Sequence, residues 1–576
     1  MKYNCENFVL FALSGVLLCG CRNGGCHDSV DADIVIYGSS PAAISAAVQA
    51  KRMGVSAVIV SPEKRLGGLT SGGLGQTDIG NKDAFGGIAL EFYRGIAGYY
   101  RSDANWKWQK KEEYFPDGQC AGTKGADSMW TFEPSAALAV LEGWVRRDGL
   151  DIRRGERLDR VSGVTKKDGR IVSVRTLSGN VYRGRMFVDA TYEGDLMAAA
   201  GVSYTVGREA NSVYGETLNG NQPNAGGSKH HNFHKGVSAY VVEGDAKSGL
   251  LPGIEPYDPS ERDGDGDRRV QAYCFRMCLT DVPENRIAFK KPEGYDERDY
   301  ELLFREYAAM TANPEEYVRG CLSGKNNLPF IMSRMPNGKT DSTTRTGFSS
   351  DFIGRNWEWP EASYERRAEI FKAHLNYQRG LMWTLANHPR IPAQIKGYFS
   401  KWGTCRDEFI DGSGDGWQSQ LYVREARRMI GDTVMTEHHC RGNAVAARPV
   451  AMGAYTMDSH HVRRRADANG CVRNEGNVEV GSDAEGRKFP PYPIDYGAII
   501  PKRGECANLF VPVCMSASHI AFGSIRMEPV FFALGQVAAT AAAQAIGGGL
   551  AVQDLPYGPL RERLLSDGQI LEINRR

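Results

Sequence analysis

Three small residues near the N-terminus, Gly38, Ser40 and Ala43, stand at the glycine positions of a G-x-G-x-x-G fingerprint. Gly38 keeps the tight turn and Ala43 is an accepted third residue, whereas the side chain of Ser40 narrows the approach of the backbone to a phosphate. Such a turn binds a pyrophosphate through backbone N–H groups at the start of a helix. The spacing therefore predicts a bound adenine dinucleotide, with its pyrophosphate over residues 38–43. The alternative is an ordinary pair of parallel strands joined through a glycine turn.

The elements around this turn follow the order needed to position it. Residues 34–37 form an apolar run of strand length, and residues 42–53 are rich in alanine with one apolar helical face before Gly54. Residues 57–60 indicate a second buried strand. A strand, helix, strand unit of this size forms a right-handed crossover in a parallel sheet, which places the helix N-terminus at the carboxyl edge of the strands.

The residue that would bind the ribose is displaced from its usual place. In the fingerprint an acidic residue about 20 positions after the glycines accepts a ribose hydroxyl. Here Ser61 ends the second predicted strand and Glu63 lies just beyond it. Either residue could bind the ribose.

Three later segments contain small or charged residues at high density. Residues 66–75, LGGLTSGGLG, contain five glycines, more than a turn requires, so the backbone there must come close to a flat or charged group. Residues 187–196 end an apolar strand in a small polar turn. Residues 523–529, GSIRMEP, end in Pro529, which suits the first position of a helix over residues 530–546. That helix would direct its positive end at the same crevice.

These segments, in this order, resemble the FAD-dependent oxidoreductase family related to the flavin subunit of heterodisulfide reductase, especially its exported Bacteroidetes-type members. The resemblance spans nearly all of the mature chain, and residues 422–431 and 451–460 also look like family segments. It implies an α/β fold, in which a Rossmann-like FAD-binding domain with a parallel sheet is interrupted by a large α+β substrate domain. We expect residues 33–203 and 493–576 to form the FAD-binding domain and residues 204–492 the substrate domain.

The resemblance also implies the cofactor, noncovalent FAD, and the residues that contact it. In the family the first glycine turn and the second glycine segment hold the pyrophosphate and flank the flavin, and the last segment approaches the pyrimidine end of the isoalloxazine. The cofactor-binding residues expected in this chain are Gly38, Ser40, Ala43, Ser61, Glu63, Gly67, Gly68, Thr70, Ser71, Gly72, Gly73, Asp189, Ala190, Thr191, Ser524, Ile525 and Arg526.

Two residues are the candidates for catalysis. When a hydride moves from a substrate carbon to the flavin, negative charge builds at N1 and the C2 carbonyl, and Arg526 with the helix that starts at Pro529 would stabilise it. If the substrate is an alcohol, a base must take the hydroxyl proton, and His519 is suitable because its ordinary pKa lies near the operating pH. The alternative is that His519 only hydrogen-bonds a loop. Further candidates for the substrate pocket are Arg424, Glu425, Asp458 and His460.

The sequence thus indicates an FAD-dependent oxidoreductase that transfers a hydride between FAD and a small-molecule substrate, for which we expect a carbohydrate or glycoside. Five tryptophans and Tyr422 in the substrate domain would suit a sugar face, and they suit a core equally well: Trp357, Trp359, Trp383, Trp402 and Trp417. Two other functions stay open. One is a polysaccharide lyase, and the other is a surface glycan-binding lipoprotein that keeps the fold as a scaffold.

Composition agrees with a globular enzyme of two domains. At 576 residues the chain is too long for one compact core. The 70 Lys and Arg balance 69 Asp and Glu, so no excess positive charge predicts nucleic acid as a partner. We expect helices over residues 299–308, 362–388 and 420–429, and a strand meander over residues 161–187 that turns at Asp168-Gly169. The sequence does not predict the oligomeric state.

The sequence predicts no metal site. The aspartate run over residues 263–267 resembles a calcium loop, but Cys274 stands where loop position twelve requires glutamate. The histidines at 230, 231 and 234 lie in a glycine-rich loop, where clustered histidines are usually exposed. No C-x-x-C run is present, which argues against an iron–sulfur centre.

The first 20 residues predict a lipoprotein signal peptide. Lys2 precedes an apolar run over residues 8–18 that is too short to span a bilayer, and residues 18–21, LCGC, resemble a lipobox. Cys21 would carry the lipid and residues 21–32 would be a tether, which locates the protein on a membrane of the bacterial cell envelope through the anchor alone. The alternatives are a plain secretory peptide and a cytoplasmic protein with an apolar start.

Overall fold

The structure is a computed structural model, and it describes residues 28–117, 120, 126–224, 231–234, 236–309 and 329–573. The expected signal peptide and the expected lipidation site Cys21 lie outside the described residues. The first described strand begins at Ser29, so the last four residues of the expected tether belong to a strand.

A seven-stranded sheet forms the centre of the half that the glycine motifs predict. Four strands run parallel in the order β3-β2-β1-β6, and the two-residue strand β21 pairs in parallel with the carboxyl end of β6. Strands β5 and β4 continue the sheet as an antiparallel meander through the Asp168-Gly169 turn, where both residues have positive φ. The bounds are β1 (Ser29–Tyr37), β2 (Ala57–Ser61), β3 (Asp151–Arg154), β4 (Val164–Lys167), β5 (Arg170–Arg175), β6 (Val181–Asp189) and β21 (Leu509–Phe510). The predicted parallel, Rossmann-like sheet is confirmed.

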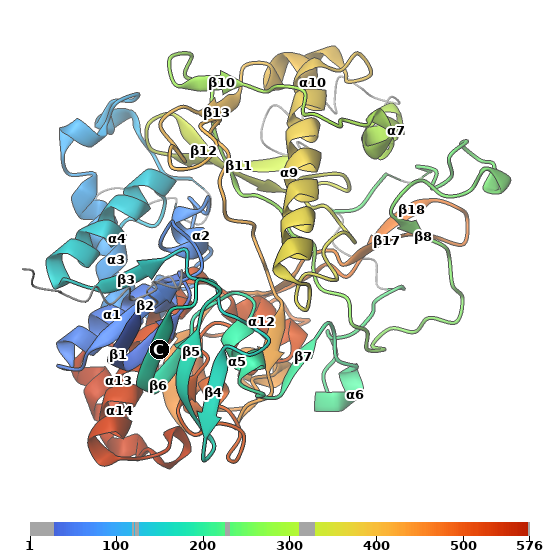
Figure 1. The fold of residues 1–576 in the computed structure, drawn as a ribbon. Coiled ribbons are helices and arrows are strands. Elements are labelled where there is room, and N and C mark those ends of the chain that lie inside the picture. The colour runs from blue at the N-terminus through green and yellow to red at the C-terminus, as the bar shows by residue number, and fades with distance from the viewer. Residues whose placement is uncertain are drawn as a thin grey trace, which may run out of the picture.

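Helices from both ends of the chain pack together on this sheet. Helix α1 (Pro41–Arg52) lies along α13 (Glu528–Gly548), and a side chain at Gly535 would come within 2.3 Å of the Ala42 carbonyl oxygen. Figure 1 shows the blue N-terminal and red C-terminal segments side by side. Among the described residues one helix, α13, is long and apolar enough to cross a membrane, and 89% of its most apolar window is buried in the protein, as in a core helix. The other helices of this half are α3 (Gly87–Tyr99), α4 (Pro134–Asp148) and α14 (Tyr557–Ser566).

A second core surrounds an antiparallel sheet with the order β10-β13-β9-β12-β11. Helix α9 (Tyr364–Asn387) runs past this sheet (Figure 1). Four of the five tryptophans of the expected substrate domain, Trp357, Trp359, Trp402 and Trp417, pack in or against this core, and Trp383 packs edge-on against Tyr295. The remaining bounds are β9 (Met277–Thr280), β10 (Arg286–Ala288), β11 (Phe330–Met335), β12 (Lys339–Thr344), β13 (Gly403–Cys405), α7 (Glu301–Ala309) and α10 (Ala393–Phe399).

Two of the three predicted helices in the central region are confirmed, and the third is wrong. Helices α7 and α9 match residues 299–308 and 362–388 closely. Residues 420–429 form an irregular extended segment that ends in β14 (Arg427–Met429), which pairs with β7 (Tyr204–Val206). Burial of this segment explains why it is extended and not helical. Arg424, Glu425 and Arg428 are each no more than 1% exposed and form ion pairs inside the protein. A surface helix would have left these charges in solvent.

Part of the range expected for the substrate domain packs in the same core as α13. Residues Met435, Val450, Met457 and Val478 belong to the same core as α13, although they lie within the range expected for the substrate domain. The division at residues 203 and 492 stays a prediction. The remaining strands and α-helices are β8 (Ile254–Glu255), β15 (Pro449–Gly453), β16 (Met457–Ser459), β17 (Arg463–Ala466), β18 (Val472–Glu475), β19 (Val478–Val480), β20 (Tyr492–Asp495), α2 (Gly68–Ser71), α5 (Asp195–Ala199), α6 (Asn211–Tyr214), α11 (Glu437–Cys440) and α12 (His519–Ile525).

Candidate active site

The first glycine turn joins the end of β1 to the end of β6. Gly38 has φ +133°, and a Cβ atom there would lie 2.4 Å from the carbonyl oxygen of Ala190. Ser40 is the N-cap of α1, but its hydroxyl donates to Ala190 O (2.7 Å) and does not cap the helix. Ala43 is buried in the first turn of α1. The N-terminus of α1 therefore has no side-chain cap, as expected of a turn that receives a phosphate.

Ser61 and Glu63, the two residues expected at the ribose, differ in whether their side-chain oxygens are already hydrogen-bonded within the protein. The Ser61 hydroxyl donates to the backbone oxygen of Glu63 (2.6 Å) and accepts from its N–H (3.2 Å). The carboxylate of Glu63 makes no hydrogen bond with a described residue, and burial raises its pKa. Glu63 is therefore the residue whose oxygens are free to accept ribose hydroxyls.

The second glycine segment is held from both ends. The N–H of Gly67 donates to Ser39 O (2.7 Å), which fixes the start of the loop to the first turn. At the other end, one carboxylate oxygen of Asp341 accepts from the N–H groups of Gly75 (3.0 Å) and Gln76 (2.9 Å). Asp341 also forms an ion pair with Arg276 (2.6 Å). The loop thus bridges the two cores.

Within this loop the side chains of Thr70 and Ser71 bind protein groups, and the backbone makes close contacts. Ser71 Oγ donates to the carbonyl oxygen of Leu66, five residues earlier. A Cβ atom at Gly68 would meet the Tyr192 hydroxyl, and one at Gly72 would meet the side chain of Gln420. The expected cofactor contacts of Gly67, Gly68, Gly72 and Gly73 are backbone contacts, for which this packing leaves room only for glycine.

The turn after β6 is held by its own side chains. One oxygen of Asp189 accepts from the N–H and hydroxyl of Thr191 (3.0 and 2.7 Å), and the other accepts from the N–H of Met197 (2.8 Å). Burial raises the pKa of Asp189 to about 6. Asp189 and Thr191 therefore shape the turn, while Ala190 presents its carbonyl oxygen to the first glycine turn.

Glu528, at the first turn of α13, was not among the expected site residues. Its carboxylate accepts from the N–H (3.1 Å) and hydroxyl (2.5 Å) of Thr70 and from the hydroxyl of Tyr192 (2.9 Å). Burial raises the pKa of Glu528 to about 7. This residue stands two positions after Arg526, so the same motif contained the signal for it.

Arg526 bonds two residues, Tyr422 and Asp458, that line a small cavity. Ser524 is engaged with Tyr455 O (2.6 Å) and the Tyr492 hydroxyl (2.7 Å), and Ile525 belongs to the main core. The guanidinium of Arg526 donates to the Tyr422 hydroxyl (2.8 Å) and to Asp458 O (3.0 Å). Among the three expected residues of this segment, Arg526 is the one with a buried side-chain donor, Nε, that has no acceptor among the described residues.

The cavity beside Arg526, which we call the inner cavity, has a volume of about 310 Å³. Its lining is mostly polar and includes Gln76, Asp78, His231, Arg276, Ser333, Thr343, Thr344, Arg345, Tyr422, Tyr455, Asp458, His460 and Glu479. The guanidiniums of Arg276, Arg424 and Arg526 each lie within 6 Å of the Tyr422 ring centre. Tyr422 and Tyr455, not the five tryptophans, are the aromatic residues of this cavity.

Three buried N–H donors in this region have no acceptor among the described residues. They are Nε of Arg424, Nε of Arg526 and Nε2 of Gln271, and Gln271 Oε1 lies 3.5 Å from Arg526. A buried donor without an acceptor is costly, so proteins rarely keep one unless a ligand or water completes it. The cluster fits an electron-rich ligand edge, such as the N1–C2 carbonyl edge of a flavin. Together with the uncapped α1 turn and the free carboxylate of Glu63, it shows that the residues fit FAD.

His519 lies beside this region with both ring nitrogens occupied. Its Nδ1 lies 2.8 Å from Glu425 Oε2, and its Nε2 lies 3.0 Å from the hydroxyl oxygen of Ser459. The side chain is 2% exposed. The assignment of His519 as base stays a prediction, and the geometry matches the alternative of a hydrogen-bonding structural role.

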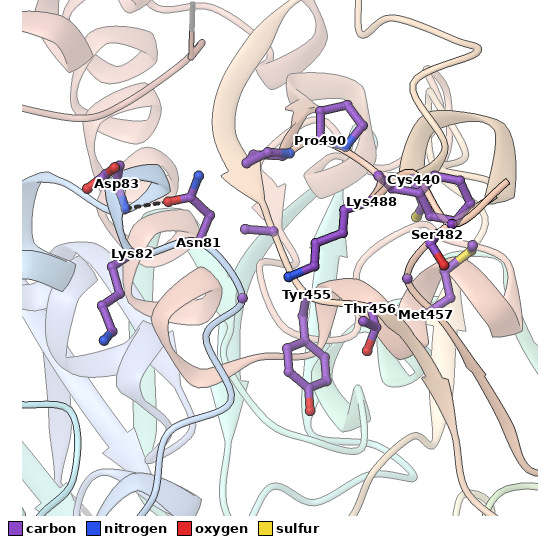
Figure 2. Close-up of a pocket in the computed structure, with 16 residues that line it drawn as sticks. Asn81, Lys82, Asp83, Cys440, Tyr455, Thr456, Met457, Ser482, Lys488 and Pro490 are labelled. Atoms are coloured by element: carbon purple, nitrogen blue, oxygen red, sulfur yellow. Dashed lines mark hydrogen bonds between the residues drawn. The ribbon is translucent and has the colours of Figure 1, made fainter. Parts of the chain in front are cut away.

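A larger, open cleft of about 1120 Å³ adjoins the inner cavity, and both share Tyr455 and Thr456. We call it the outer cleft. In Figure 2 Lys488 extends toward Tyr455 from one wall, and the segment with Asn81, Lys82 and Asp83 forms the opposite wall. The outer cleft gives an extended molecule a place to lie next to the inner cavity.

Comparison with known proteins shows the family of the chain. A sequence profile described as FAD dependent oxidoreductase matches residues 33–564. No curated protein matches the chain. The chain belongs to the FAD dependent oxidoreductase family and is an FAD-dependent enzyme.

Solved structures of other proteins are similar to part of the chain. One is CabE, an aromatic hydroxylase from angucycline biosynthesis, with 20% identity over 31% of this chain and 35% of that chain and a TM-score of 0.23. Another is a flavin-containing monooxygenase from Stenotrophomonas maltophilia, with 18% identity, 32% and 43% coverage and a TM-score of 0.18. A third is 3-ketosteroid-delta4-(5alpha)-dehydrogenase from Rhodococcus jostii RHA1, with 15% identity, 31% and 50% coverage and a TM-score of 0.19. The chain thus spans half or less of the length of these three.

Proposed function

We propose that this enzyme oxidises a hydroxyl-bearing small molecule, a carbohydrate or glycoside, by hydride transfer to noncovalent FAD. The observation that supports this most directly is the inner cavity, where polar side chains from both halves of the chain surround Tyr422 next to Arg526. A sugar offers several hydroxyl groups to such donors and acceptors and a flat apolar face to a tyrosine ring. The adjoining outer cleft leaves room for a glycosidic substituent.

Bound FAD would supply the two-electron acceptor. The protein would bind and orient the cofactor and the substrate and neutralise the charge that develops on reduction. The uncapped N-terminus of α1 would hold the pyrophosphate, and the carboxylate of Glu63 would hold the ribose. Arg526 and the positive end of α13 would stabilise negative charge at the pyrimidine end of the reduced flavin. Arg526 is 2% exposed, so water screens its charge little and its effect is large.

The proposal is tested by anaerobic flavin reduction. The purified mature chain, loaded with FAD, is mixed with a panel of sugars, glycosides and hydroxy acids, and the flavin absorbance is followed. We expect bleaching with at least one sugar or glycoside. Bleaching with hydroxy acids alone would overturn the substrate class. A colourless protein that releases unsaturated uronates would favour the lyase, and a colourless protein that binds glycans without turnover would favour the binding lipoprotein.

We further propose, from the sequence, that the protein is lipid-anchored at Cys21 in the cell envelope. The apolar run followed by LCGC supports this proposal.

A further inference from the structure

His460 projects into the inner cavity from the end of strand β16. Its side chain is 17% exposed, whereas the side chains of Asp351 and Asp458, which lie next to its ring, are 2% and 16% exposed. Nδ1 lies 2.9 Å from Asp351 Oδ2, and Nε2 lies 3.7 Å from Asp458 Oδ2. Nδ1 is thus bound to a buried carboxylate, whereas Nε2 makes no hydrogen bond to a described residue and lies beside Asp458, which lines the inner cavity together with His460.

Asp351 fixes the orientation of this imidazole. Burial alone would raise its pKa, but the neighbouring Arg424, which lies 2.9 Å from Oδ1, and His460 outweigh that effect and hold the pKa well below its ordinary value. Asp351 is therefore ionised at neutral pH and can only accept a hydrogen bond. Nδ1 of His460 must carry the proton of the shared bond, which leaves Nε2 as the bare nitrogen.

Building on the proposed function, we propose that His460 is the general base of this enzyme, oriented by Asp351 and acting through Nε2 on a substrate hydroxyl in the inner cavity. The hydroxyl proton passes to Nε2 as the carbon–oxygen single bond becomes a carbonyl. The C–H bond breaks at the same carbon, and its two electrons leave with the hydride to the oxidised flavin that the proposed function supplies. The products are a carbonyl compound, reduced flavin and protonated His460, so atoms and charges balance.

The same geometry gives His519 a positioning role. Ser459 accepts or donates the bond to His519 Nε2 and directly precedes His460 in the chain. Glu425 holds the other side of the His519 ring and also accepts from the N–H of Gln271, whose Oε1 in turn accepts from the N–H of His460 (2.9 Å). His519 thus fixes the backbone that carries the base.

Several other charged groups face His460, and they will shape its pH dependence. Burial and Arg424 lower the pKa of His460, so its neutral form dominates at neutral pH. The rate of substrate oxidation should therefore fall on the acid side of neutrality as His460 becomes protonated. The groups on the surrounding elements are Asp78, His231, Arg276, Arg345, Asp351, Arg424, Asp458, His461, Glu479 and Arg526.

The test compares FAD-loaded His460→Gln and Asp351→Asn with wild type and with the matched control His234→Gln, whose side chain is 44% exposed and paired with Glu306. The probe is each sugar or glycoside that bleaches the wild-type flavin. We expect His460→Gln to bind FAD and the bound flavin to be reduced by dithionite as in the wild type. Reduction of the flavin by the sugar should be about 10² to 10⁴-fold slower. The decrease in rate on the acid side of the pH profile should be absent. Asp351→Asn should slow the reaction less and shift that limb. His234→Gln should match wild type.

A second measurement needs no substrate. Nitrogen-15 NMR of histidine-labelled protein reports which ring nitrogen carries the proton, and comparison with His460→Gln assigns the signal. In the wild type we expect the neutral His460 ring to carry its proton on Nδ1. In Asp351→Asn we expect this preference for Nδ1 to be lost. A proton on Nε2, or a wild-type rate in well-folded His460→Gln, would overturn the assignment. If no panel compound reduces the wild-type flavin, the proposed function fails, while the NMR result still decides the orientation of His460.

Discussion

The carboxylate of Glu528 accepts hydrogen bonds from both the backbone N–H and the hydroxyl of Thr70, at 3.1 and 2.5 Å. This pair ties the first turn of α13 to the second glycine segment, although the residues are 458 positions apart in the chain. The positive end of a helix and a glycine loop thus meet through one buried carboxyl group.

The first prediction concerns Glu528 and pH. Its folded-state pKa is raised to about 7 from 4.5, so the folded protein holds this proton more tightly than the unfolded chain does. The stability contribution is therefore present at low pH and is lost as pH rises through 7. Between pH 5.5 and 8 the apoprotein should lose about 2 kcal/mol from this group. Urea unfolding of wild type and Glu528→Gln at both pH values checks this, because the mutant should lack that part of the decrease.

A control for Glu528→Gln is Glu113→Gln, which changes an exposed carboxyl. Its pH dependence should parallel that of wild type. Equal pH dependence in wild type and Glu528→Gln would show that the Glu528 carboxyl is ionised across the whole range.

The second prediction is that Gly38→Val abolishes FAD binding. The backbone there has φ +133°, and a Cβ atom would lie 2.4 Å from Ala190 O, so the turn cannot keep its shape. We expect at least a tenfold loss of bound flavin, measured by absorbance after gel filtration and by reconstitution with FAD. Gly98→Ala, where a Cβ atom would meet no neighbour, should keep full occupancy. A fully loaded Gly38→Val protein would contradict the assignment of the pyrophosphate to this turn.

The third prediction is that Arg526→Ala keeps FAD but lowers its reduction potential. Loss of the guanidinium removes the positive partner of the charge that develops on reduction. Hydride transfer should slow on the order of a hundredfold or more, since one such contact contributes about 2.7 to 4 kcal/mol in the transition state. Potentiometry with a reference dye and anaerobic reduction rates measure the two effects. The exposed Arg503→Ala is the control, and an unchanged potential in loaded Arg526→Ala would place the arginine outside the flavin site.

The fourth prediction is that Cys21→Ser releases the protein from membranes. The thiol of the lipobox cysteine is the acceptor of the lipid, and serine does not replace it. Membrane fractionation and mass spectrometry of the N-terminus check this, with Cys26→Ser as the control. Membrane association of Cys21→Ser equal to wild type would rule out this anchor.

The sequence predicted the parts of the fold that local patterns determine. The turn around Gly38, helices α7 and α9 and the meander after Asp168 are each specified by contiguous residues, and all are present. The helix expected over residues 420–429 is absent because its charged side chains are paired with partners far along the chain. Arg424 finds Asp351, and Arg428 finds Glu209. No local periodicity contains that information.

The candidate site was predictable to the same extent. The glycine segments and Arg526 could be found because they are consecutive in sequence. The pairing of His460 with Asp351 joins residues 109 positions apart, and that of Glu528 with Thr70 joins residues separated by most of the chain. His519 was selected for the ordinary pKa of its residue type, which says nothing of whether its nitrogens are already bound.

The packing of α13 on α1, and of β21 on β6, also determines when during synthesis the cofactor half can close. When the ribosome has completed β6, the chain still lacks the helix that covers α1 and the strand that lies beside Phe187 and Val188. More than 300 residues must follow before Leu509 and Gly535 are available. The nascent chain therefore carries an uncovered apolar helix face for most of its synthesis, and proteins in this state depend on chaperones or on delayed folding. If the protein is exported, the late synthesis of β21 and α13 would keep the chain unfolded while it crosses a membrane, before it folds around its cofactor.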